Sequence, residues 1–326
     1  MSPIFTNTIF ANPVTLWIVL GVAAVLALGA ALILALSFTG RLQPALRREL
    51  WLRLGSWCVL APLMIVPILL GKFWVVAAVT ILGLACYREY ARATGLFREH
   101  LVSAIVVVGI LVVNLASADH WYGFFAALLP LCCGFIAIAS IPLDRPQGYV
   151  QRVGLGVYGF FLFGAALAHF GYMANDPNYR PIMLMLLLAV GLNDVGAFCF
   201  GKTIGGPKLV PRTSPNKTIS GAVGALIFTT IVVALLGHFV FAGTVMDTPL
   251  ILIGLGLIVS VAGQLGDLML SSIKRDIGIK DMGQAIPGHG GILDRFNSLL
   301  LVAPSAFHYI AYFIGFGLDQ PARIWF

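Results

Sequence analysis

The sequence predicts an all-α, polytopic transmembrane protein with about ten spans, and three observations lead to this class. The chain has 326 residues, of which 60% are hydrophobic and 10% charged, and its mean hydropathy is +0.97. Such a composition lies far outside that of water-soluble domains of this size. Apolar runs long enough to span a bilayer recur along the chain. Lysine and arginine gather in alternate loops between these runs.

The apolar runs give the expected positions of the spans. We expect them at residues 14–38, 56–71, 73–87, 101–117, 121–141, 153–173, 181–201, 218–241, 249–270 and 298–317. The second and third runs are short, so one hairpin or a re-entrant pair is an alternative there. The first 13 residues lack a positively charged segment, which favours a retained span over a cleaved signal peptide.

The basic residues orient these spans in the membrane. All but three of the 20 lysines and arginines fall in alternate loops, which we expect to be cytoplasmic. The exceptions are Lys72, Arg180 and Arg323. Both termini are therefore expected outside a bacterial cytoplasmic (inner) membrane. The net charge of +7 then reflects topology and attraction to anionic lipid or phosphate, and we expect no nucleic-acid partner.

The first half of the chain indicates anchoring, so residues 1–180 are expected to form membrane-anchoring helices. Residues 41–54 alternate arginine with leucine and tryptophan, which suits an amphipathic helix lying on the cytoplasmic leaflet. Glu89 ends the third span, and we expect it to pair with Arg88 or Arg92 at the membrane face, with a substrate contact as the alternative. His169 is expected to be a buried histidine with its hydrogen bonds satisfied.

Polar residues suited to chemistry begin at Asp194, so residues 181–326 are expected to form a C-terminal catalytic transmembrane domain. Asp194 is a carboxylate near the cytoplasmic end of the seventh span. The loop at 201–221 then supplies cations able to neutralise a triphosphate, and hydroxyls near the start of the next helix, where free N–H groups favour an anion. The cations are Lys202, Lys208, Arg212 and Lys217, and the hydroxyls belong to Ser214 and Thr218.

Residues 196–203 match the P-loop pattern GxxxxGK[ST] letter for letter. A working P-loop follows a buried strand in a soluble α/β domain. Here the residues between Gly196 and Gly201 are Ala, Phe, Cys and Phe inside a membrane span. We therefore interpret the match as coincidental.

The densest polar stretch runs from Gly266 to Ser298, between two apolar segments. Asp267 ends an apolar run, where a lipid-facing carboxylate costs at least ~2.5 kcal/mol, so it must face protein, water or a cation. On a helix, Asp267, Ser271 and Lys274 share one face, with Arg275 beside them. The helix is expected to end after Gly278.

The loop that follows combines charge, glycine and histidine. It contains Lys280, Asp281, Pro287, Gly288, His289, Gly290, Gly291, Asp294 and Arg295. Such glycines allow close backbone approach to a phosphate, and Asp267 and Asp294 are candidate ligands of a hard divalent cation. An ordinary solvated loop is the alternative, but it requires neither a carboxylate in an apolar run nor three glycines around a histidine.

These residues resemble a known family. The pattern SxxKR, then Lys280-Asp281, then PGHGGxxDR ending at Arg295 is similar to the C-terminal signature of the phosphatidate cytidylyltransferases, the CDP-diacylglycerol synthases. Asp194 through Thr218 are similar to that family's upstream motif. The resemblance covers about residues 190–310. It departs at Asn297, where the family usually has aspartate, and at Leu270, where it often has glutamate.

The resemblance implies a polar active site facing the cytoplasm, in which the phosphate of phosphatidate attacks the α-phosphorus of CTP. It implies Mg²⁺ as cofactor, with a second, monovalent or divalent cation as an option. We expect catalytic roles for Asp267, Asp294, Lys274, Asp281 and His289, with Asp267 and Asp294 as metal ligands. Substrate-binding roles are expected for Asp194, Lys202, Lys208, Ser214, Lys217, Thr218, Ser271, Arg275, Lys280, Gly290, Gly291 and Arg295.

Other interpretations stay open at this point. A related CTP-using enzyme could act on another lipid phosphate or an isoprenoid alcohol. The carboxylates could instead form the path of a cation-coupled transporter, which would place polar residues along several spans. A third reading is a catalytically silent homologue that binds lipid. A CDP-alcohol phosphotransferase is disfavoured because its repeated aspartate motif is not evident. The oligomeric state is open, with a homodimer as one option.

Overall fold

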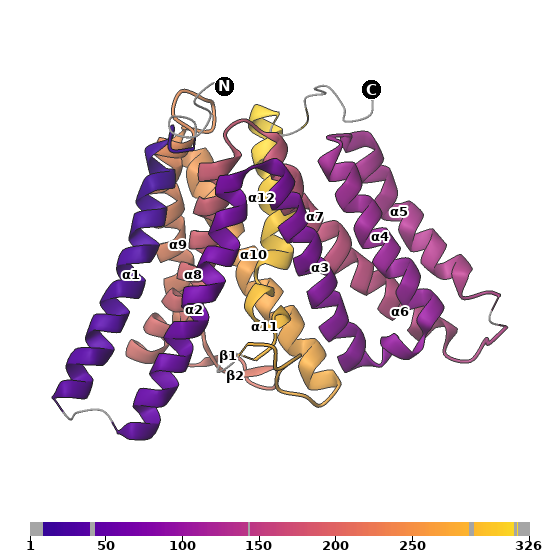
Figure 1. The fold of residues 1–326 in the computed structure, drawn as a ribbon, viewed down its shortest axis with the longest axis horizontal. Coiled ribbons are helices and arrows are strands. Elements are labelled where there is room, and N and C mark those ends of the chain that lie inside the picture. The colour runs from indigo at the N-terminus through magenta and orange to yellow at the C-terminus, as the bar shows by residue number, and fades with distance from the viewer. Residues whose placement is uncertain (1–8, 40–42, 143, 287–289, 316–317, 319–326) are drawn as a thin grey trace.

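The computed structural model describes residues 9–39, 43–142, 144–286, 290–315 and 318. Within these residues, ten helical segments are long and apolar enough to cross a membrane, which confirms the expected number of spans. The helices stand side by side as a bundle (Figure 1). Large apolar side chains such as Leu28, Val150 and Leu250 lie exposed on its outside, as expected for a surface solvated by lipid.

The first five spans are simple helices. They are α1 (Pro13–Phe38), α2 (Pro44–Leu70), α3 (Lys72–Thr94), α4 (His100–Ala118) and α5 (Tyr122–Ala139), with a 3₁₀ turn η1 (Leu96–Arg98) before α4. At 56–87, where one hairpin or a re-entrant pair was the alternative, α2 and α3 are two helices that each have spanning length and meet at Gly71. Gly71 has a φ of 132°, which a glycine adopts without strain.

One expectation for this region is wrong. Residues 44–54 form the first turns of α2 and not a separate helix lying on the leaflet. A periodic pattern of arginine and leucine is equally compatible with the polar first turns of a longer helix, and here α2 runs unbroken from Pro44 into the apolar segment.

The sixth span changes its helical geometry midway. It consists of α6 (Tyr149–Gly159), a π-helical segment η2 (Phe160–Ala166), α7 (Leu167–Tyr172) and a 3₁₀ turn η3 (Met173–Asn175). Nearly all of η2 and α7 is buried against α3, α4 and α12. His169 is buried here, and its Nδ1 lies 2.8 Å from the carbonyl oxygen of Ala165, as expected for a satisfied histidine.

The remaining elements form the half that carries the polar motifs. They are α8 (Tyr179–Thr203), β1 (Lys208–Val210), β2 (Ser214–Thr218), α9 (Ile219–Val240), α10 (Pro249–Asp276), α11 (Leu293–Phe296) and α12 (Leu299–Ile314). The antiparallel hairpin β1–β2 is an addition to the all-α expectation, within the segment expected to be a loop. Thr218 ends β2 and caps α9, because its Oγ1 accepts a hydrogen bond from the N–H of Gly221 at 3.1 Å.

The length of α10 determines where its polar end lies. Its 28 residues extend for about 42 Å, whereas the hydrocarbon core of a bilayer is about 30 Å thick. With Pro249 at one membrane surface, Asp267 lies near the other surface and Lys274 beyond it. The helix ends at Asp276, close to the predicted end at Gly278, whose φ is 72°.

The two halves of the chain pack against each other. α12 packs on α7, α1 and α2 contact α8, and α3 contacts α11. The hairpin and α11 lie at one end of the bundle, and α1 begins and α12 ends at the opposite end (Figure 1). The division into an anchoring part, 1–180, and a catalytic part, 181–326, stays a prediction.

Candidate active site

A cavity of about 270 Å³ opens at the end of the bundle that carries the hairpin. It lies among α8, β2, α9, α10 and the segment around α11. Its lining consists of three aspartates, two basic residues, amides and apolar groups: Asp194, Ala197, Phe198, Leu209, Asn216, Lys217, Thr218, Gly221, Ala222, Gln264, Asp267, Asp294, Arg295 and Asn297. Residues separated by about 100 positions in the sequence thus meet in one polar cavity.

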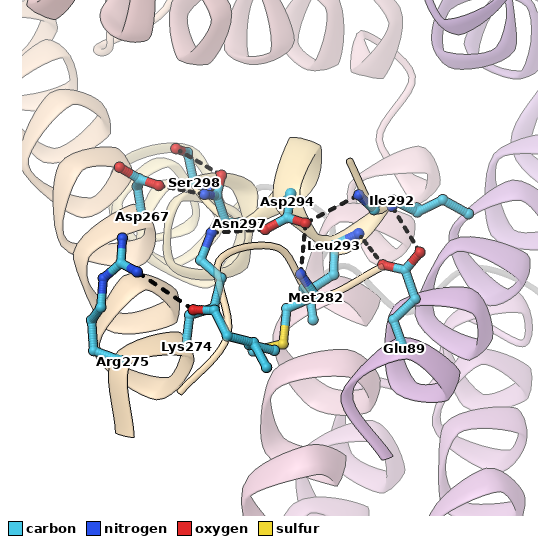
Figure 2. Close-up of polar contacts among 12 residues, drawn as sticks. Glu89, Asp267, Lys274, Arg275, Met282, Ile292, Leu293, Asp294, Asn297 and Ser298 are labelled. Atoms are coloured by element: carbon cyan, nitrogen blue, oxygen red, sulfur yellow. Dashed lines mark hydrogen bonds and ion pairs between the residues drawn. The ribbon is translucent and has the colours of Figure 1, made fainter. Parts of the chain in front are cut away.

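Asp267, on α10, contacts both β2 and the segment that follows α11. Its Oδ2 forms an ion pair with the ammonium of Lys217 from β2. Its Oδ1 accepts a hydrogen bond from Nδ2 of Asn297 at 2.5 Å, the contact drawn in Figure 2. The side chains of Asp267 and Lys217 are each about one quarter exposed, so a ligand can reach the pair.

Asp294 lies deeper and holds the loop before it. Its Oδ1 accepts a hydrogen bond from Nζ of Lys274 at 2.8 Å, in an ion pair whose two side chains are 13% and 3% exposed. Its Oδ2 accepts from the backbone N–H groups of Met282 at 2.9 Å and Gly291 at 3.1 Å. Asp294 therefore fixes both ends of the segment that carries the glycine-rich motif (Figure 2).

Asp194 faces the same cavity from α8. Its charged neighbours are Asp267, Lys217 and Arg295. The residue before it, Asn193, is buried, and its Oδ1 accepts hydrogen bonds from Ser260 at 2.6 Å and Thr229 at 3.2 Å. These bonds tie α8 to α9 and α10 directly beneath the cavity and so fix the position of Asp194.

The structure brings together only part of the predicted residue set. Asp194, Lys217, Thr218, Asp267, Asp294 and Arg295 line the cavity, and Lys274 lies behind it on Asp294. Arg275 donates instead to the carbonyl oxygens of Thr213 and Ile279. Ser271 is buried. Asp281 is exposed and lies close to Gly290, while His289 falls outside the described residues.

Three predicted phosphate-binding lysines lie away from the cavity lining. Lys202, Lys208 and Lys280 are exposed to solvent. Nζ of Lys202 lies 5.7 Å from the ring centroid of Phe198. Residues 196–203 belong to α8, so the GxxxxGKT match is part of a helix, as the interpretation of a coincidental match requires. Ser214 lies in β2, paired with Val210.

Sequence reasoning missed several members of the site. Gln264 lines the cavity, and an uncharged amide within an apolar run gives little signal. Glu89 was expected to pair with Arg88 or Arg92, but its carboxylate instead accepts hydrogen bonds from the backbone of Ile292 and Leu293. A glutamate at the end of an apolar run could have indicated a functional role for Glu89. Its partners could not be predicted, because they lie more than 200 residues away in the sequence.

The cavity's donor set suits a hard cation shared with a substrate. Within the described ranges, no group of three or more His, Cys, Asp or Glu side chains could hold a metal ion. Mg²⁺ characteristically binds through one or two carboxylates, water and substrate phosphate oxygens, so the lining carboxylates fit this mode. Asp194 and Asp267 have the greater free capacity, because three donors already bind Asp294.

A second cavity, of about 310 Å³, lies between α3, α6 and α10. Its described lining includes Tyr90, Tyr158 and Asp276 but neither lysine nor arginine. A polyphosphate requires cationic partners. The candidate active site is therefore the cavity around Asp267.

The fold and the cavity define a class: a multi-pass membrane protein with a carboxylate- and cation-lined site at one end of its helices. The model of the cytidylyltransferase family matches residues 51–313. The chain belongs to this family, and it is a nucleotidyltransferase.

Similar proteins include bacterial enzymes of known name. The phosphatidate cytidylyltransferase of Staphylococcus aureus (strain COL) is 34% identical over 252 residues, which cover 76% of this chain and 94% of that protein. The enzyme of the same name from Staphylococcus haemolyticus is 33% identical over 257 residues, with the same two coverages. The uncharacterized protein YnbB of Escherichia coli (strain K12) is 34% identical over 198 residues, which cover 59% of this chain and 65% of that protein.

Proposed function

We propose that the protein is a phosphatidate cytidylyltransferase, which converts CTP and phosphatidate into CDP-diacylglycerol and pyrophosphate in phospholipid biosynthesis. The observation that carries the proposal is the cavity in which Asp194, Asp267 and Asp294 meet Lys217 and Arg295 at the membrane boundary. The name and coverage of the staphylococcal relatives support the same reaction.

The chemistry asks little of the protein beyond positioning and charge neutralisation. A phosphate oxygen of phosphatidate forms a bond to the α-phosphorus of CTP, and the bond from that phosphorus to the bridging oxygen breaks to release pyrophosphate. The nucleophile belongs to the substrate, so the protein need not supply one. Lys217 and Arg295 are placed to neutralise the triphosphate, and Lys274 keeps Asp294 fixed behind them.

The proposed cofactor is Mg²⁺, held by Asp267 and Asp194 with Asp294 in support. This differs from the sequence-based pair Asp267 and Asp294, because the oxygens of Asp294 already accept from Lys274, Met282 and Gly291. A divalent ion there supplies charge neutralisation on phosphate oxygens. The cavity also leaves a second, monovalent or divalent cation as an option.

The direct test uses purified protein in phosphatidate-containing micelles with labelled CTP and Mg²⁺. We expect the label to appear in a chloroform-soluble nucleotide lipid, with release of pyrophosphate. CTP binding without product from phosphatidate would redirect the proposal to another lipid phosphate or an isoprenoid alcohol. Absence of CTP binding would favour a transporter or a silent lipid-binding homologue.

We further propose that the site end of the bundle faces the cytoplasm of a bacterial cell and that both termini lie outside the inner membrane. The support is the gathering of lysines and arginines in the loops at that end. A periplasmic alkaline phosphatase reporter is expected to be active when fused after Ile314 and inactive when fused after Ser140. The reverse pattern would overturn this orientation.

Asn297 offers a test of the proposed cation site. Its Nδ2 donates to Asp267, so Asn297→Asp replaces a donor with a second carboxylate. Without Mg²⁺, we expect the free energy of unfolding to fall by about 1.5–3 kcal/mol, the usual contribution of a hydrogen bond to a charged group. With Mg²⁺ the two carboxylates can share the ion, so the Mg²⁺-induced rise in unfolding temperature should exceed that of the native protein.

The matched control for this variant is Asn178→Asp. Nδ2 of Asn178 donates to the carbonyl oxygen of Val240 at the opposite end of the bundle. Thermal unfolding in detergent, with and without Mg²⁺, compares the two variants. A Mg²⁺-induced rise for Asn297→Asp no larger than that of the control would count against a cation at Asp267.

A further inference from the structure

We propose that Glu89, in the N-terminal half of the chain, is a positioning residue for cytidylyl transfer. It fixes the loop that delivers Asp294 and Arg295 to the cavity, although it lies in a span expected only to anchor the protein. This inference rests on the proposed function and extends the reaction machinery to α3.

The contact between Glu89 and the loop is bidentate. Oε1 accepts a hydrogen bond from the N–H of Ile292 at 3.0 Å, and Oε2 accepts from the N–H of Leu293 at 2.9 Å. These two amides begin the short helix α11, whose own geometry offers them no acceptor. Figure 2 shows Glu89 reaching this backbone from the side opposite Lys274.

The loop is shaped to admit this side chain. A Cβ atom added at Gly283 would lie 2.5 Å from Oε1 of Glu89, and one added at Gly291 would lie 2.5 Å from Oε2. Both distances are far below van der Waals contact. Glycine at these two positions therefore creates the slot in which the carboxylate sits.

Two carboxylates from distant parts of the chain share one run of backbone. The N–H of Gly291 donates to Asp294, and the next two N–H groups donate to Glu89. Three consecutive amides are thus held by anions, as in an anion-binding nest. Displacing Glu89 would free the N–H groups of Ile292 and Leu293, which directly follow the N–H of Gly291 that binds Asp294.

The helix that carries Glu89 is itself rigidly placed. Tyr90 is buried, and its hydroxyl donates to the carbonyl oxygen of Leu155 in α6 at 3.2 Å. Tyr87 is also buried, and its hydroxyl donates to Ser103 in α4 at 2.9 Å. Glu89 therefore anchors an otherwise irregular loop to a helix that is firmly packed in the bundle.

This arrangement predicts which kinetic constant depends on Glu89. Lys217 belongs to β2 and Asp267 to α10, and the two form an ion pair, so their backbone positions are set outside the loop although Asp267 also accepts from Asn297. CTP binding should persist when the loop loosens. The rate of transfer should fall, because Asp294 and Arg295 would no longer be held in place.

The experiment compares Glu89→Gln with the native protein in the micelle assay. The amide keeps the size of the side chain but presents an NH₂ group to one of the two backbone donors. We expect kcat to fall by about tenfold or more, the scale of one lost charge-assisted hydrogen bond, while KM for CTP changes by less than about threefold. Hydrogen–deuterium exchange should quicken in peptides covering 282–298 and stay unchanged in α8 and α9.

Two comparisons isolate the contact. Glu99→Gln is the matched control, because Glu99 lies ten residues later and only approaches Arg152, at 3.8 Å. A double-mutant cycle then pairs Glu89→Ala with Gly283→Ala, since the atoms closest to the added methyl belong to Glu89. The loss of kcat caused by Gly283→Ala should largely disappear in the Glu89→Ala background.

The outcomes separate this inference from the proposed function. Native-like kcat and loop exchange in Glu89→Gln, or equal effects of Glu89→Gln and Glu99→Gln, would overturn the positioning role. Additive effects of Glu89→Ala and Gly283→Ala would do the same. A native protein that transfers no cytidylyl group would overturn the proposed function, while the exchange data would still decide whether Glu89 holds the loop.

Discussion

The Asp294→Ala variant is expected to lose cytidylyl transfer almost completely. Removing this carboxylate leaves the ammonium of Lys274 without its partner in a site where that side chain is 13% exposed. It also leaves the N–H groups of Met282 and Gly291 without acceptors. Breaking a buried ion pair costs about 3–5 kcal/mol of folding stability. Losing a preorganised electrostatic group typically costs about 10²–10³ in kcat, so we expect kcat to fall by at least about 100-fold.

A folding defect must be separated from a catalytic one in this experiment. Asp294→Asn is the second variant, since its amide oxygen can still accept from the loop backbone while the charge that holds Lys274 is lost. It should unfold below the native temperature but above that of Asp294→Ala, because the loop amides keep an acceptor, and it should transfer far more slowly than the native protein. Asp276→Asn, at the exposed end of α10, is the matched control and should keep native kcat. Native activity in Asp294→Asn would show that the charge is dispensable.

The Asp267→Asn variant is expected to show the second-largest loss. It keeps the size of the side chain and an oxygen for Asn297, but it removes the charge that pairs with Lys217. Losing one preorganised electrostatic group typically costs about 10²–10³ in kcat, and we expect a loss in this range. Stability should change little, because Lys217 is about one quarter exposed and water can solvate its ammonium.

The measurement for Asp267→Asn is kcat and KM for CTP as a function of Mg²⁺ concentration. We expect the Mg²⁺ concentration that gives half-maximal rate to rise, because one of the proposed ligands is weakened. Asp247→Asn is the matched control. Asp247 lies in the loop before α10, at the end of that helix away from Asp267, and pairs with His238 at 2.7 Å. An unchanged Mg²⁺ dependence with a reduced kcat would assign Asp267 to phosphate positioning and not to the cation.

Much of the fold could be predicted because a membrane restricts the choices. A lipid environment permits only helices that satisfy their own backbone, so apolar length gives the spans. The ten expected runs agree in number with the ten candidate spans found in the described part of the chain, and the end of α10 near Gly278 was expected from its glycine and charges. The boundary at 44–54 was wrong because local amphipathicity carries no information on whether a helix continues.

The site was predicted less completely, for reasons visible in particular residues. Asp267 and Asp294 stood out because charges in or beside apolar runs are costly. Lys202, Lys208 and Lys280 are close in sequence to the residues of the site, but their side chains lie in solvent outside the cavity lining. Whether a basic side chain enters a cavity depends on the rotation of its helix or strand, which spacing alone does not give.

By itself, the sequence determined the class of the protein, its number of spans and the two polar segments that carry its chemistry. These follow from the cost of placing polar groups in lipid, which is paid residue by residue along the chain. The tertiary structure alone decided the pairing of Lys217 with Asp267, the burial of Asp294 on Lys274 and the reach of Glu89 to Ile292 and Leu293. Such contacts depend on how helices pack and rotate, and that is settled by side chains from the whole bundle together.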